Sequence, residues 1–460
     1  MLKRMLNART LTLVLVEFIL IVLAVDFAAF IRFGPVPIRA LNSWTLRAIV
    51  VAAVLQLCLH YADLYDLRGL SDRRDAVSRL LQALGAACVI LAIVYYWIPQ
   101  WMIGRGVFAL ATTFVIGLSA GWRIAFEWLS LKGGPAERLL IVGTSGAAVT
   151  LARELFARRT ELGVDLVGFV DQDPRLVGQP MINPGVIGVV SDIPEIVKTR
   201  KVDRVVVSLA DARGKLDMDA LLAMKINAGV RFDHLASVYE QYTGKIAVEN
   251  LRPSWLIFSD GFKKSTRLEG TKRVFEALFA ALALIVAAPV MLLVALAIRV
   301  SSSGPVLYSQ ARVGKAGVLF TIYKFRSMSV DAEQTSGAVW SVKNDPRVTA
   351  LGRWLRRTRL DELPQLWNVL RGDMSFVGPR PERPEFIAEL QRRIPYYGQR
   401  HVVRPGLTGW AQVRHRYGSS IEDAQEKLQY ELFYIKNMSV TFDLYILLET
   451  VKTVLMRAGS

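Results

Sequence analysis

Two adjacent carboxylates, Asp361 and Glu362, lie in a stretch that is rich in arginine, Leu355 to Pro381. An ionised carboxylate can act as a nucleophile, and a neighbouring carboxylate can hold a hard cation such as Mg²⁺ through its oxygens. Positive charge nearby favours the ionised form, so we expect Asp361 to be charged at neutral pH. The arginines of this stretch are Arg356, Arg357, Arg359, Arg371 and Arg380.

The segment from Asp361 to Pro364 also has the features of a helix start. Proline fits the first turn because its missing N–H has no partner there, so we expect Asp361 at the N-cap and Glu362 in the first turn. A helix N-terminus carries partial positive charge and free N–H groups, which suit a phosphate. The alternative is that Asp-Glu-Leu-Pro is an ordinary capped helix start with no chemical role.

Further cations occur where the backbone is regular or stiffened. The strand-like segment Leu319 to Met328 carries two of them, and the turn Val403 to Val413 carries another. Pro379 and Pro381 flank Arg380 and limit where its guanidinium can go, which suits bidentate phosphate recognition. Each basic residue alone has the alternative of a solvated or lipid-facing position. The candidate substrate-binding residues are Lys324, Arg326, Arg356, Arg380 and Arg404.

The composition argues against a wholly soluble protein. Of 460 residues 52% are hydrophobic, and the mean hydropathy is +0.32. The net charge of +17 indicates an anionic partner, which is a phosphate-bearing substrate, a membrane surface or nucleic acid. The two cysteines, Cys58 and Cys88, lie in apolar runs and exclude a disulfide framework or a zinc site. No small-residue cleavage site follows the first apolar run, so we expect no cleaved signal peptide.

Residues 1–135 are expected to form a four-helix transmembrane bundle, because each of four apolar runs has about the ~20 residues that a membrane span needs. The runs are residues 11–31, 45–61, 79–98 and 106–122. Basic residues precede the first run, separate the second from the third and follow the fourth, so both ends of the bundle should be cytoplasmic. Glu17 and Asp26 lie inside the first run. They are either functional or turned towards a neighbouring helix or the membrane interface, and the second alternative is favoured because no basic partner lies within another run.

Residues 136–250 alternate between strand-like and helix-like segments, which predicts a doubly wound, Rossmann-like α/β domain. The turn from Gly143 to Ala148 departs from a dinucleotide fingerprint, because Ser145 and Ala148 replace the second and third glycines. Asp171 lies near the expected position of a ribose-binding acid. Nucleotide binding and a structural or regulatory role both stay open. The absence of a Tyr-x-x-x-Lys sequence argues against a sugar-nucleotide epimerase or dehydratase.

A basic linker, residues 251–271, leads into an apolar helix, residues 272–300. Ala277 to Ile298 contains no charge, but Pro289 should bend the helix, and basic residues at both ends favour no direction of crossing. We therefore expect a re-entrant membrane helix, with a proline-kinked fifth span as the alternative. Residues 301–460 form the expected catalytic domain, and two amphipathic helices within Asp423 to Met456 should lie on the membrane.

Three motifs, YKFRSM, LDELPQLWNVLRGDMSFVGPRP and VRPGLTGWAQV, carry a resemblance to a known family. With the helix around Pro289, they make residues 272–456 similar to the bacterial sugar transferases, which are monotopic phosphoglycosyl transferases. The whole layout resembles the large polyisoprenyl-phosphate hexose-1-phosphate transferases. PSWLIFSDGF, residues 253–262, is similar to members found with exopolysaccharide export loci.

The resemblance implies roles for particular residues. Asp361 would attack the β-phosphate of a UDP-sugar, release UMP and form a phosphosugar aspartyl enzyme, which polyprenyl (undecaprenyl) phosphate would then attack. Glu362 would coordinate Mg²⁺. Lys324, Arg356 and Arg380 would bind substrate phosphates. Arg359 departs from the family, because many members have a small residue there.

The resemblance also implies a cellular setting. We expect a multi-pass protein of the bacterial inner membrane, with its catalytic domain facing the cytoplasm, that starts exopolysaccharide synthesis. Expected partners are a UDP-sugar, with UDP-glucose and UDP-galactose leading, polyprenyl phosphate, membrane lipids, a second copy in a homodimer and downstream glycosyltransferases, but no nucleic acid. The rival interpretations are a membrane-bound sugar-nucleotide-modifying enzyme that uses the Rossmann-like domain, and a membrane scaffold that regulates polysaccharide length.

Overall fold

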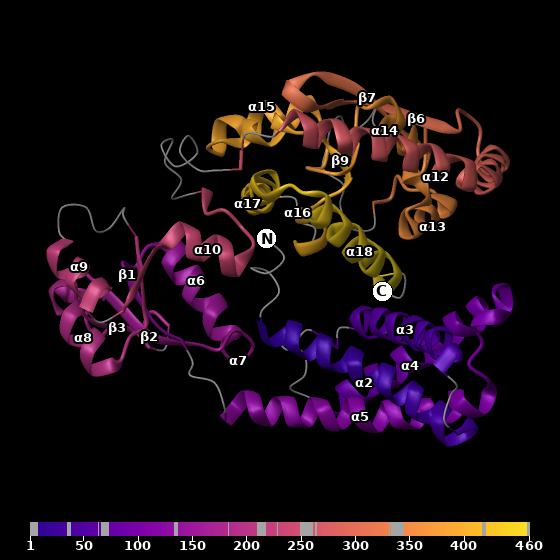
Figure 1. The fold of residues 1–460 in the computed structure, drawn as a ribbon. Helices are drawn as coiled ribbons and strands as arrows, with labels where there is room; N and C mark the ends of the chain where they lie inside the picture. Colours follow the sequence, from indigo (N-terminus) through magenta and orange to yellow (C-terminus); the bar gives the residue numbers. More distant parts are fainter. Residues whose placement is uncertain are drawn as a thin grey trace. The chain divides into compact units, whose positions relative to one another are not determined.

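The computed structural model describes residues 8–34, 38–62, 64–65, 73–132, 137–182, 184–208, 218–227, 229–248, 261–262, 265–330, 332, 345–415 and 420–457 (Figure 1). The chain divides into two compact units, one ending at Val238 and the other running from Tyr239 to the C-terminus. Most of the segment 253–262 and the linker residues Lys263 and Lys264 lie outside the described residues.

The first unit begins with long apolar helices. They are α2 (Ala8–Phe33), α3 (Ile38–Tyr61), α4 (Arg73–Trp97) and α5 (Arg105–Lys132), with a short 3-10 turn η1 (Pro99–Trp101) before α5. Each contains a segment long and apolar enough to cross a membrane, in agreement with the four predicted runs. Helix α2 buries small side chains such as Ala24 and Ala28 and exposes large ones such as Leu15, Ile19 and Leu23. Small buried residues allow close helix approach, and large exposed ones suit lipid.

One expectation about these helices is wrong. Glu17 is fully buried on α2, and it does have a basic partner, Arg123, because α5 stays helical beyond residue 122. The guanidinium of Arg123 donates to both carboxylate oxygens of Glu17, at 3.0 and 2.8 Å, and to the carbonyl of Leu64 at 2.6 Å. Glu17 is therefore turned towards a neighbouring helix, and the pair ties α2, α5 and the chain after α3 together.

The rest of the first unit is the predicted doubly wound α/β domain. Its five parallel strands have the order β3-β2-β1-β4-β5. The strands are β1 (Glu137–Val142), β2 (Val164–Asp171), β3 (Val186–Val189), β4 (Arg204–Val207) and β5 (Arg231–His234); the helical segments are α6 (Gly146–Ala157), α7 (Arg159–Leu162), η2 (Pro174–Leu176), η3 (Val190–Asp192), α8 (Ile193–Arg200), α9 (Met218–Asn227) and α10 (Leu235–Thr243). Strands β3 and β5, four residues each, were not predicted.

The glycine-containing turn after β1 is closed by contacts within the protein. Ser145 caps α6, where its side chain accepts a hydrogen bond from the amide of Ala148. The carboxylate of Asp171 accepts from the hydroxyl of Thr144 at 2.7 Å, and its other oxygen accepts from the amide of Gln172 at 2.7 Å. Asp171 therefore has hydrogen-bond partners without a ligand, and nucleotide binding and a structural or regulatory role both stay open for this turn.

The second unit is built around one long helix. Its elements are α12 (Thr266–Ser301), β6 (Leu307–Val313), η5 (Lys315–Gly317), β7 (Leu319–Phe325), α13 (Ala350–Thr358), η6 (Leu360–Glu362), α14 (Gln365–Arg371), β8 (Ser375–Val377), α15 (Pro384–Arg393), η7 (Tyr397–Val402), β9 (Gly406–Thr408), α16 (Trp410–Arg414), α17 (Ile421–Asn437) and α18 (Val440–Arg457). Strands β6 and β7 form an antiparallel hairpin, and β8 and β9 form a short parallel pair.

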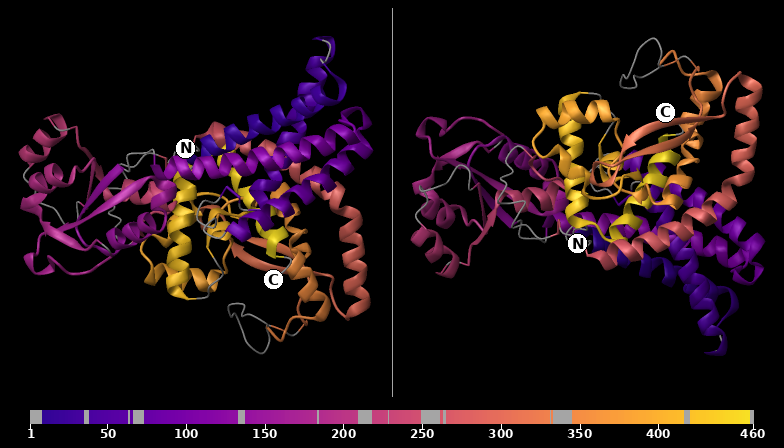
Figure 2. Two further views of the ribbon diagram at one scale, coloured as in Figure 1. Left: turned by 90° about the horizontal axis from the view of Figure 1, so that it is seen from below. Right: turned by 90° about the horizontal axis from the view of Figure 1, so that it is seen from above.

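Helix α12 starts at Thr266, earlier than the predicted residue 272, and contains Pro289. Proline offers no N–H to the carbonyl of Ile285, and most sharp helix kinks arise at proline. Figure 2 shows that α12 changes direction along its length, as predicted, and so has two arms. Near its start Ala280 packs with Val369 of α14, and near its end Ile298 packs with α13. The first arm thus packs against α14, and the second packs against Leu360 and Leu363, which flank Asp361.

Helix α17 corrects the expectation that it lies on the membrane. It buries Leu428 and every residue from Tyr430 to Ile435, because it packs in the interior of this unit. Its amphipathic pattern marks a core helix. Helix α18 does expose apolar side chains: Val440, Leu444, Leu448 and Val451.

Residues just after Val238 belong with α17. The hydroxyl of Tyr239 bonds to the side chain of Gln429 at 3.1 Å, and the amide of Ile246 donates to the carbonyl of Gln429 at 3.1 Å. The indole N–H of Trp410 donates to the carbonyl of Gly244 at 2.9 Å. The structural division therefore falls before the expected boundary at residue 250.

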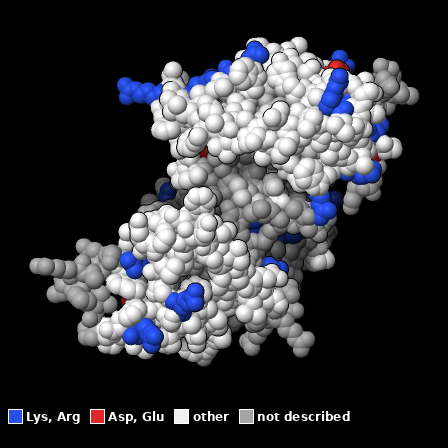
Figure 3. Space-filling model, turned by 90° about the vertical axis from the view of Figure 1, so that its right-hand side faces the viewer, with Lys and Arg blue, Asp and Glu red and all other residues white. Residues whose placement is uncertain are grey.

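The face in Figure 3 is largely uncharged, and most of the charged side chains that appear on it are Lys or Arg. Among the residues that the structure describes, five helices could cross a membrane, including Glu269–Ser301 within α12, and they account for most of the exposed large apolar residues. These surfaces suit lipid, and the protein is a membrane protein.

Candidate active site

The two carboxylates lie in a tight turn between two helices. Helix α13 ends at Arg359, which has a left-handed backbone with φ of +60°, and a 3-10 turn from Leu360 to Glu362 follows. Pro364 occupies the N-cap of α14. The expectation that Asp361 is the N-cap is therefore wrong, because the 3-10 turn separates it from the α-helix.

Asp361 is buried, with 7% of its surface exposed. Its Oδ1 atom has no hydrogen-bond partner among the residues that the structure describes. Burial and the charge of Glu362 raise the pKa of Asp361 to about 6, although Lys324, Arg356 and Arg359 act to lower it. We expected the cations to keep the pKa of Asp361 low, but burial outweighs them and raises it. A carboxyl group with a pKa of about 6 is still about nine-tenths ionised at pH 7, as expected.

Glu362 shows the opposite behaviour. Its Oε1 lies 2.9 Å from Nζ of Lys324 and 3.2 Å from Nη2 of Arg380, and its Oε2 lies 3.9 Å from Arg359. Burial acts to raise the pKa of Glu362, but these three cations hold it well below its usual range. Glu362 is therefore a permanent anion that fixes the positions of Lys324 and Arg380.

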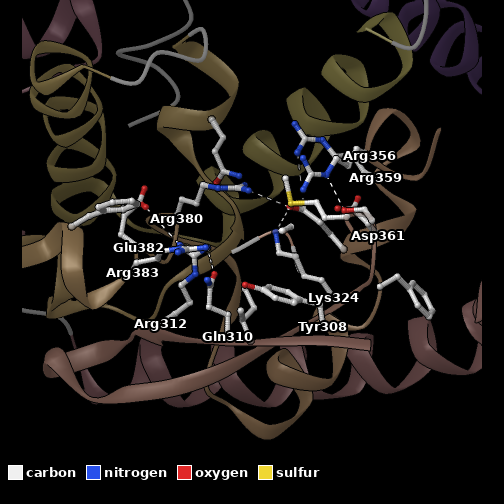
Figure 4. A pocket seen from close by; sticks show the side chains of 18 of the residues that line it. Tyr308, Gln310, Arg312, Lys324, Arg356, Arg359, Asp361, Arg380, Glu382 and Arg383 are labelled. Atoms are coloured by element: carbon white, nitrogen blue, oxygen red, sulfur yellow. Dashed lines mark hydrogen bonds and ion pairs between the residues drawn. The ribbon is translucent and has the colours of Figure 1, made fainter. Parts of the chain in front are cut away.

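The elements around this turn place the predicted cations at one pocket. Lys324 projects from β7, opposite Tyr308 of β6 in the hairpin. Arg356 precedes Asp361 on α13, and its Nε donates to the hydroxyl of Ser327 at 2.9 Å. Figure 4 shows Lys324 and Arg356 with Asp361 around one cavity. Lys324, Arg356 and Arg380, expected to bind phosphate, are thus brought together with the carboxylate pair.

Hydrogen bonds from other residues to its backbone carbonyls hold the turn that carries Arg380 in place. The sequence predicted stiffness from Pro379 and Pro381, and the structure adds three hydrogen bonds from distant elements. A Cβ at Gly378 would overlap the carbonyl of Arg404, so glycine allows this close approach. The carbonyl of Pro379 accepts from the amide of Gly406 at 2.8 Å. The carbonyl of Arg380 accepts from the guanidinium of Arg400 at 2.8 Å, and that of Pro381 accepts from the guanidinium of Arg312 at 3.1 Å.

Arg400 is a structural residue of this site that sequence analysis missed. It is 3% exposed and donates to both carboxylate oxygens of the buried Glu431 on α17, at 2.8 and 2.6 Å. The pair keeps a charged guanidinium in the interior, where it is able to hold the carbonyl of Arg380. Only the three-dimensional structure brings η7 and α17 together, so no local sequence signal marks this role.

Two predicted substrate-binding residues have other surroundings. Arg326 is 8% exposed and lines the cavity, but its guanidinium donates to the carbonyls of Ser302 and Ser303, at 2.9 and 2.8 Å. It holds the chain that leaves α12. Arg404 lies outside the Asp361 cavity and lines a void of about 20 Å³ beside Lys272. We do not include these two residues in the proposed phosphate site.

The cavity has a volume of about 580 Å³ and extends well beyond Asp361. Figure 4 shows Gln310, Arg312, Glu382 and Arg383 together at one end, with Asp361, Arg356 and Arg359 at the other. Sequence analysis did not single out Gln310 and Arg312. The available signal was the polar alternation of Tyr308, Gln310 and Arg312 along β6, which places all three on one face of the strand.

The carboxylate pair fits a magnesium ion that a substrate completes. Mg²⁺ is commonly held by one or two carboxylates, with water and substrate phosphates filling its other positions. Within the described ranges no group of three or more His, Cys, Asp or Glu side chains can hold a metal by itself. Adjacent Asp361 and Glu362, with the unpartnered Oδ1 of Asp361, provide the donors that such a shared site needs.

The apolar helices indicate a membrane protein, and a cation-lined cavity around a buried carboxylate is a kind of site that suits a phosphorylated ligand. Residues 267–457 match the bacterial sugar transferase family, and residues 60–217 match the CoA-binding domain family. The chain belongs to the bacterial sugar transferase family and is a transferase.

Three curated relatives show how far this similarity extends. The UDP-glucose:undecaprenyl-phosphate glucose-1-phosphate transferase of Xanthomonas campestris pv. campestris is 31% identical over 78% of this chain and 74% of its own. The UDP-N-acetylgalactosamine-undecaprenyl-phosphate N-acetylgalactosaminephosphotransferase of Aeromonas hydrophila is 39% identical over 56% of this chain and 60% of its own. The exopolysaccharide production protein PSS of Rhizobium leguminosarum bv. phaseoli is 44% identical over 40% of this chain and 96% of its own.

Proposed function

We propose that the chain transfers a hexose 1-phosphate from a UDP-sugar to undecaprenyl phosphate and that Asp361 carries the phosphosugar between them. The observation that carries this proposal is the buried carboxylate of Asp361, whose Oδ1 has no hydrogen-bond partner within the described part of the chain. It lies beside Glu362, which is ringed by Lys324, Arg359 and Arg380.

In the first half-reaction an oxygen of Asp361 attacks the β-phosphorus of the donor. A bond forms between this oxygen and phosphorus, and the bond from phosphorus to the bridging oxygen breaks. The electron pair leaves with UMP, so the enzyme now holds an acyl phosphate that carries the sugar. An anionic nucleophile and a diphosphate repel each other, and Lys324, Arg356 and Arg380 offset that repulsion.

In the second half-reaction a phosphate oxygen of the lipid attacks the phosphorus of the same intermediate. The bond from phosphorus to Asp361 breaks, which returns the carboxylate and yields polyprenyl diphosphate sugar. A covalent intermediate lets one cavity handle a water-soluble donor and a lipid acceptor in turn. Glu362 would hold Mg²⁺ against the diphosphate, and the bound ion supplies further positive charge there.

The membrane setting belongs to the same proposal. A four-span bundle formed by α2 to α5 and a re-entrant α12, bent at Pro289, would keep the cavity at the cytoplasmic surface of the inner membrane. There the phosphate of the lipid and the soluble donor meet. Exopolysaccharide synthesis would start with this transfer, and downstream glycosyltransferases would extend the product. A homodimer is part of this proposal by family resemblance alone.

The relatives named above act on glucose and on N-acetylgalactosamine derivatives, which makes UDP-glucose and UDP-N-acetylgalactosamine the first donors to examine beside UDP-galactose. A screen of UMP release across UDP-sugars, with undecaprenyl phosphate present, identifies the donor.

The test of the nucleophile uses the purified full-length protein and donor alone. Wild type should release UMP once and gain the mass of a hexose phosphate on Asp361, and Asp361→Asn should do neither while staying folded. Asp165→Asn is the matched control, because Asp165 is a solvent-exposed acid of the first unit. An active Asp361→Asn enzyme, or lipid turnover by wild type with no mass added to Asp361, would refute the proposal.

A further inference from the structure

We propose that the cavity reads the uracil ring of the donor, with Arg312, at the end opposite Asp361, as hydrogen-bond donor and Gln412 as acceptor. This inference rests on the proposed function and adds to it the residues that recognise the nucleoside. Both side chains line the same cavity as Asp361.

The direction of the donor follows from the chemistry. In a phosphoryl transfer the attacking and leaving oxygens lie roughly in line on opposite sides of phosphorus. If Asp361 attacks, UMP must therefore leave along the cavity, away from Asp361. Arg380 lies 3.2 Å from Glu362 on this path, and Arg312 lies beyond it at the far end (Figure 4).

Arg312 is held so that one donor points to no protein group. Its Nη2 donates to the side-chain oxygen of Gln310 at 2.7 Å, and its Nη1 donates to the carbonyl of Pro381 at 3.1 Å. The carboxylate of Glu382 lies 3.8 Å from the same Nη1. The Nε atom is buried and has no hydrogen-bond partner in the described part of the protein.

Gln412 supplies the complementary group from α16. Its Nε2 donates to the carbonyl of Leu407 at 3.3 Å, which fixes the amide so that Oε1 is the remaining acceptor. Oε1 is buried, and the structure gives it no hydrogen-bond partner among the residues it describes. A buried polar atom without a partner is costly, and a ligand that completes the bond is one explanation for such an atom in a side chain that lines a cavity.

A phosphate does not satisfy both groups, because it presents only acceptors to the acceptor Oε1 of Gln412. A uracil ring does, since its N3–H donates and its adjacent carbonyl oxygens accept. Cytosine placed in the same orientation presents an acceptor at N3 and would leave Gln412 unsatisfied. The two groups therefore favour uracil over cytosine, which is the discrimination that an enzyme for UDP-sugars needs.

The experiment measures nucleotide binding by calorimetry to the full-length protein in lipid nanodiscs, with UMP, CMP and N3-methyl-UMP as probes. Wild type should bind UMP at least about tenfold more tightly than CMP or N3-methyl-UMP, as the loss of one buried hydrogen bond implies. The Gln412→Leu variant should bind UMP, CMP and N3-methyl-UMP with equal affinity. The Arg312→Met variant should bind UMP more weakly than wild type does. Gln391→Leu, at an exposed position of α15, is the matched control and should behave as wild type.

The outcomes separate the two proposals. If Gln412→Leu still prefers UMP over N3-methyl-UMP while wild type forms the Asp361 adduct, the uracil assignment is wrong and the proposed function stands. If Gln412→Leu raises the KM of the UDP-sugar but leaves UMP binding unchanged, the sugar occupies this end and the assignment is again wrong. If wild type discriminates as expected but forms no adduct, the proposed function fails. Thermal unfolding of each variant shows that it is folded.

Discussion

Asp361 and Glu362 are adjacent in sequence, yet their carboxyl groups have pKa values displaced in opposite directions. Glu362 takes the contacts with Lys324 and Arg380 and stays charged. Asp361 is buried beside that charge, and its pKa is raised to about 6. A more basic carboxylate is a stronger nucleophile, and this one is still largely ionised at neutral pH. This division of contacts supports the proposal that Asp361 attacks the donor while Glu362 holds the cations.

The raised pKa of Asp361 predicts a pH dependence for the first half-reaction. Only the ionised form attacks, so the rate of UMP release in a single turnover should be constant above pH 7 and fall as the pH drops through about 6. At pH 5 it should be about tenfold lower, because about one-tenth of the carboxyl group is then ionised. Rapid-quench measurements between pH 5 and 8 check this, and a rate that is flat down to pH 5 contradicts it.

The raised pKa of Asp361 also predicts that its ionised carboxylate lowers the stability of the folded protein. A carboxyl group whose pKa is higher in the folded protein than its model value of 3.8 destabilises the fold once it is ionised. Asp361→Asn should therefore raise the free energy of unfolding at pH 7.5, by up to about 3 kcal/mol from about 1.4 kcal/mol per pKa unit. The gain should shrink as the pH falls below about 6 and vanish near pH 4. Thermal unfolding of both proteins at several pH values measures it, and an Asn variant less stable at pH 7.5 argues against burial as the cause.

Arg359 acts on the same pKa. It lowers the pKa of Asp361, and 44% of its side chain is exposed. Arg359→Ser should therefore move the midpoint of the single-turnover pH profile to higher pH, while Arg353→Ser, at an exposed position of α13, should not. Arg359→Gly should shift the midpoint equally and also relieve the left-handed backbone, by about 1 kcal/mol. Equal midpoints in wild type and Arg359→Ser would show that this arginine does not reach the carboxylate.

At the scale of elements, α12 supports the site through both of its arms. Pro289→Leu restores a hydrogen bond to the carbonyl of Ile285 and favours a straight helix long enough to span. In a variant without Cys58 and Cys88, a cysteine introduced by Ser301→Cys should react with a membrane-impermeant reagent only from the cytoplasmic side. Adding Pro289→Leu should lower that labelling and UMP release together. Labelling of Ser301→Cys from outside in the protein that keeps Pro289 would contradict a re-entrant helix.

Elements differ in how much of them could be predicted from sequence. The apolar runs predicted the apolar segments of α2 to α5, because about twenty apolar residues leave few alternatives, but the helices extend up to ten residues beyond the runs. The stretch around Asp361 was found from its own residue types. The burial of Asp361 and the bond from Arg400 to the Arg380 carbonyl were not predictable, because they depend on elements distant in sequence. Helix α17 was misassigned because an amphipathic pattern does not distinguish a membrane surface from a protein core.

At the scale of the whole molecule, the cavity belongs to one unit. All of its lining residues lie between Pro305 and Glu431, within the unit that starts at Tyr239. A relative that matches over 96% of its own length corresponds to only 40% of this chain. We therefore predict that residues 239–460, purified in detergent, form the Asp361 adduct and release UMP at a rate within about tenfold of the full chain. A folded fragment that forms no adduct would show that the first unit contributes to the reaction.

The size of the cavity has a consequence for control in the cell. A volume of about 580 Å³ suits one nucleotide sugar, so a nucleotide that stays behind after the first half-reaction occupies the position that the lipid phosphate must enter. Flux through the enzyme then depends on how quickly other enzymes rephosphorylate this by-product. If the chain starts polymer synthesis as proposed, a cell that rephosphorylates UMP slowly would slow its surface-polymer output at this step, without any dedicated regulator.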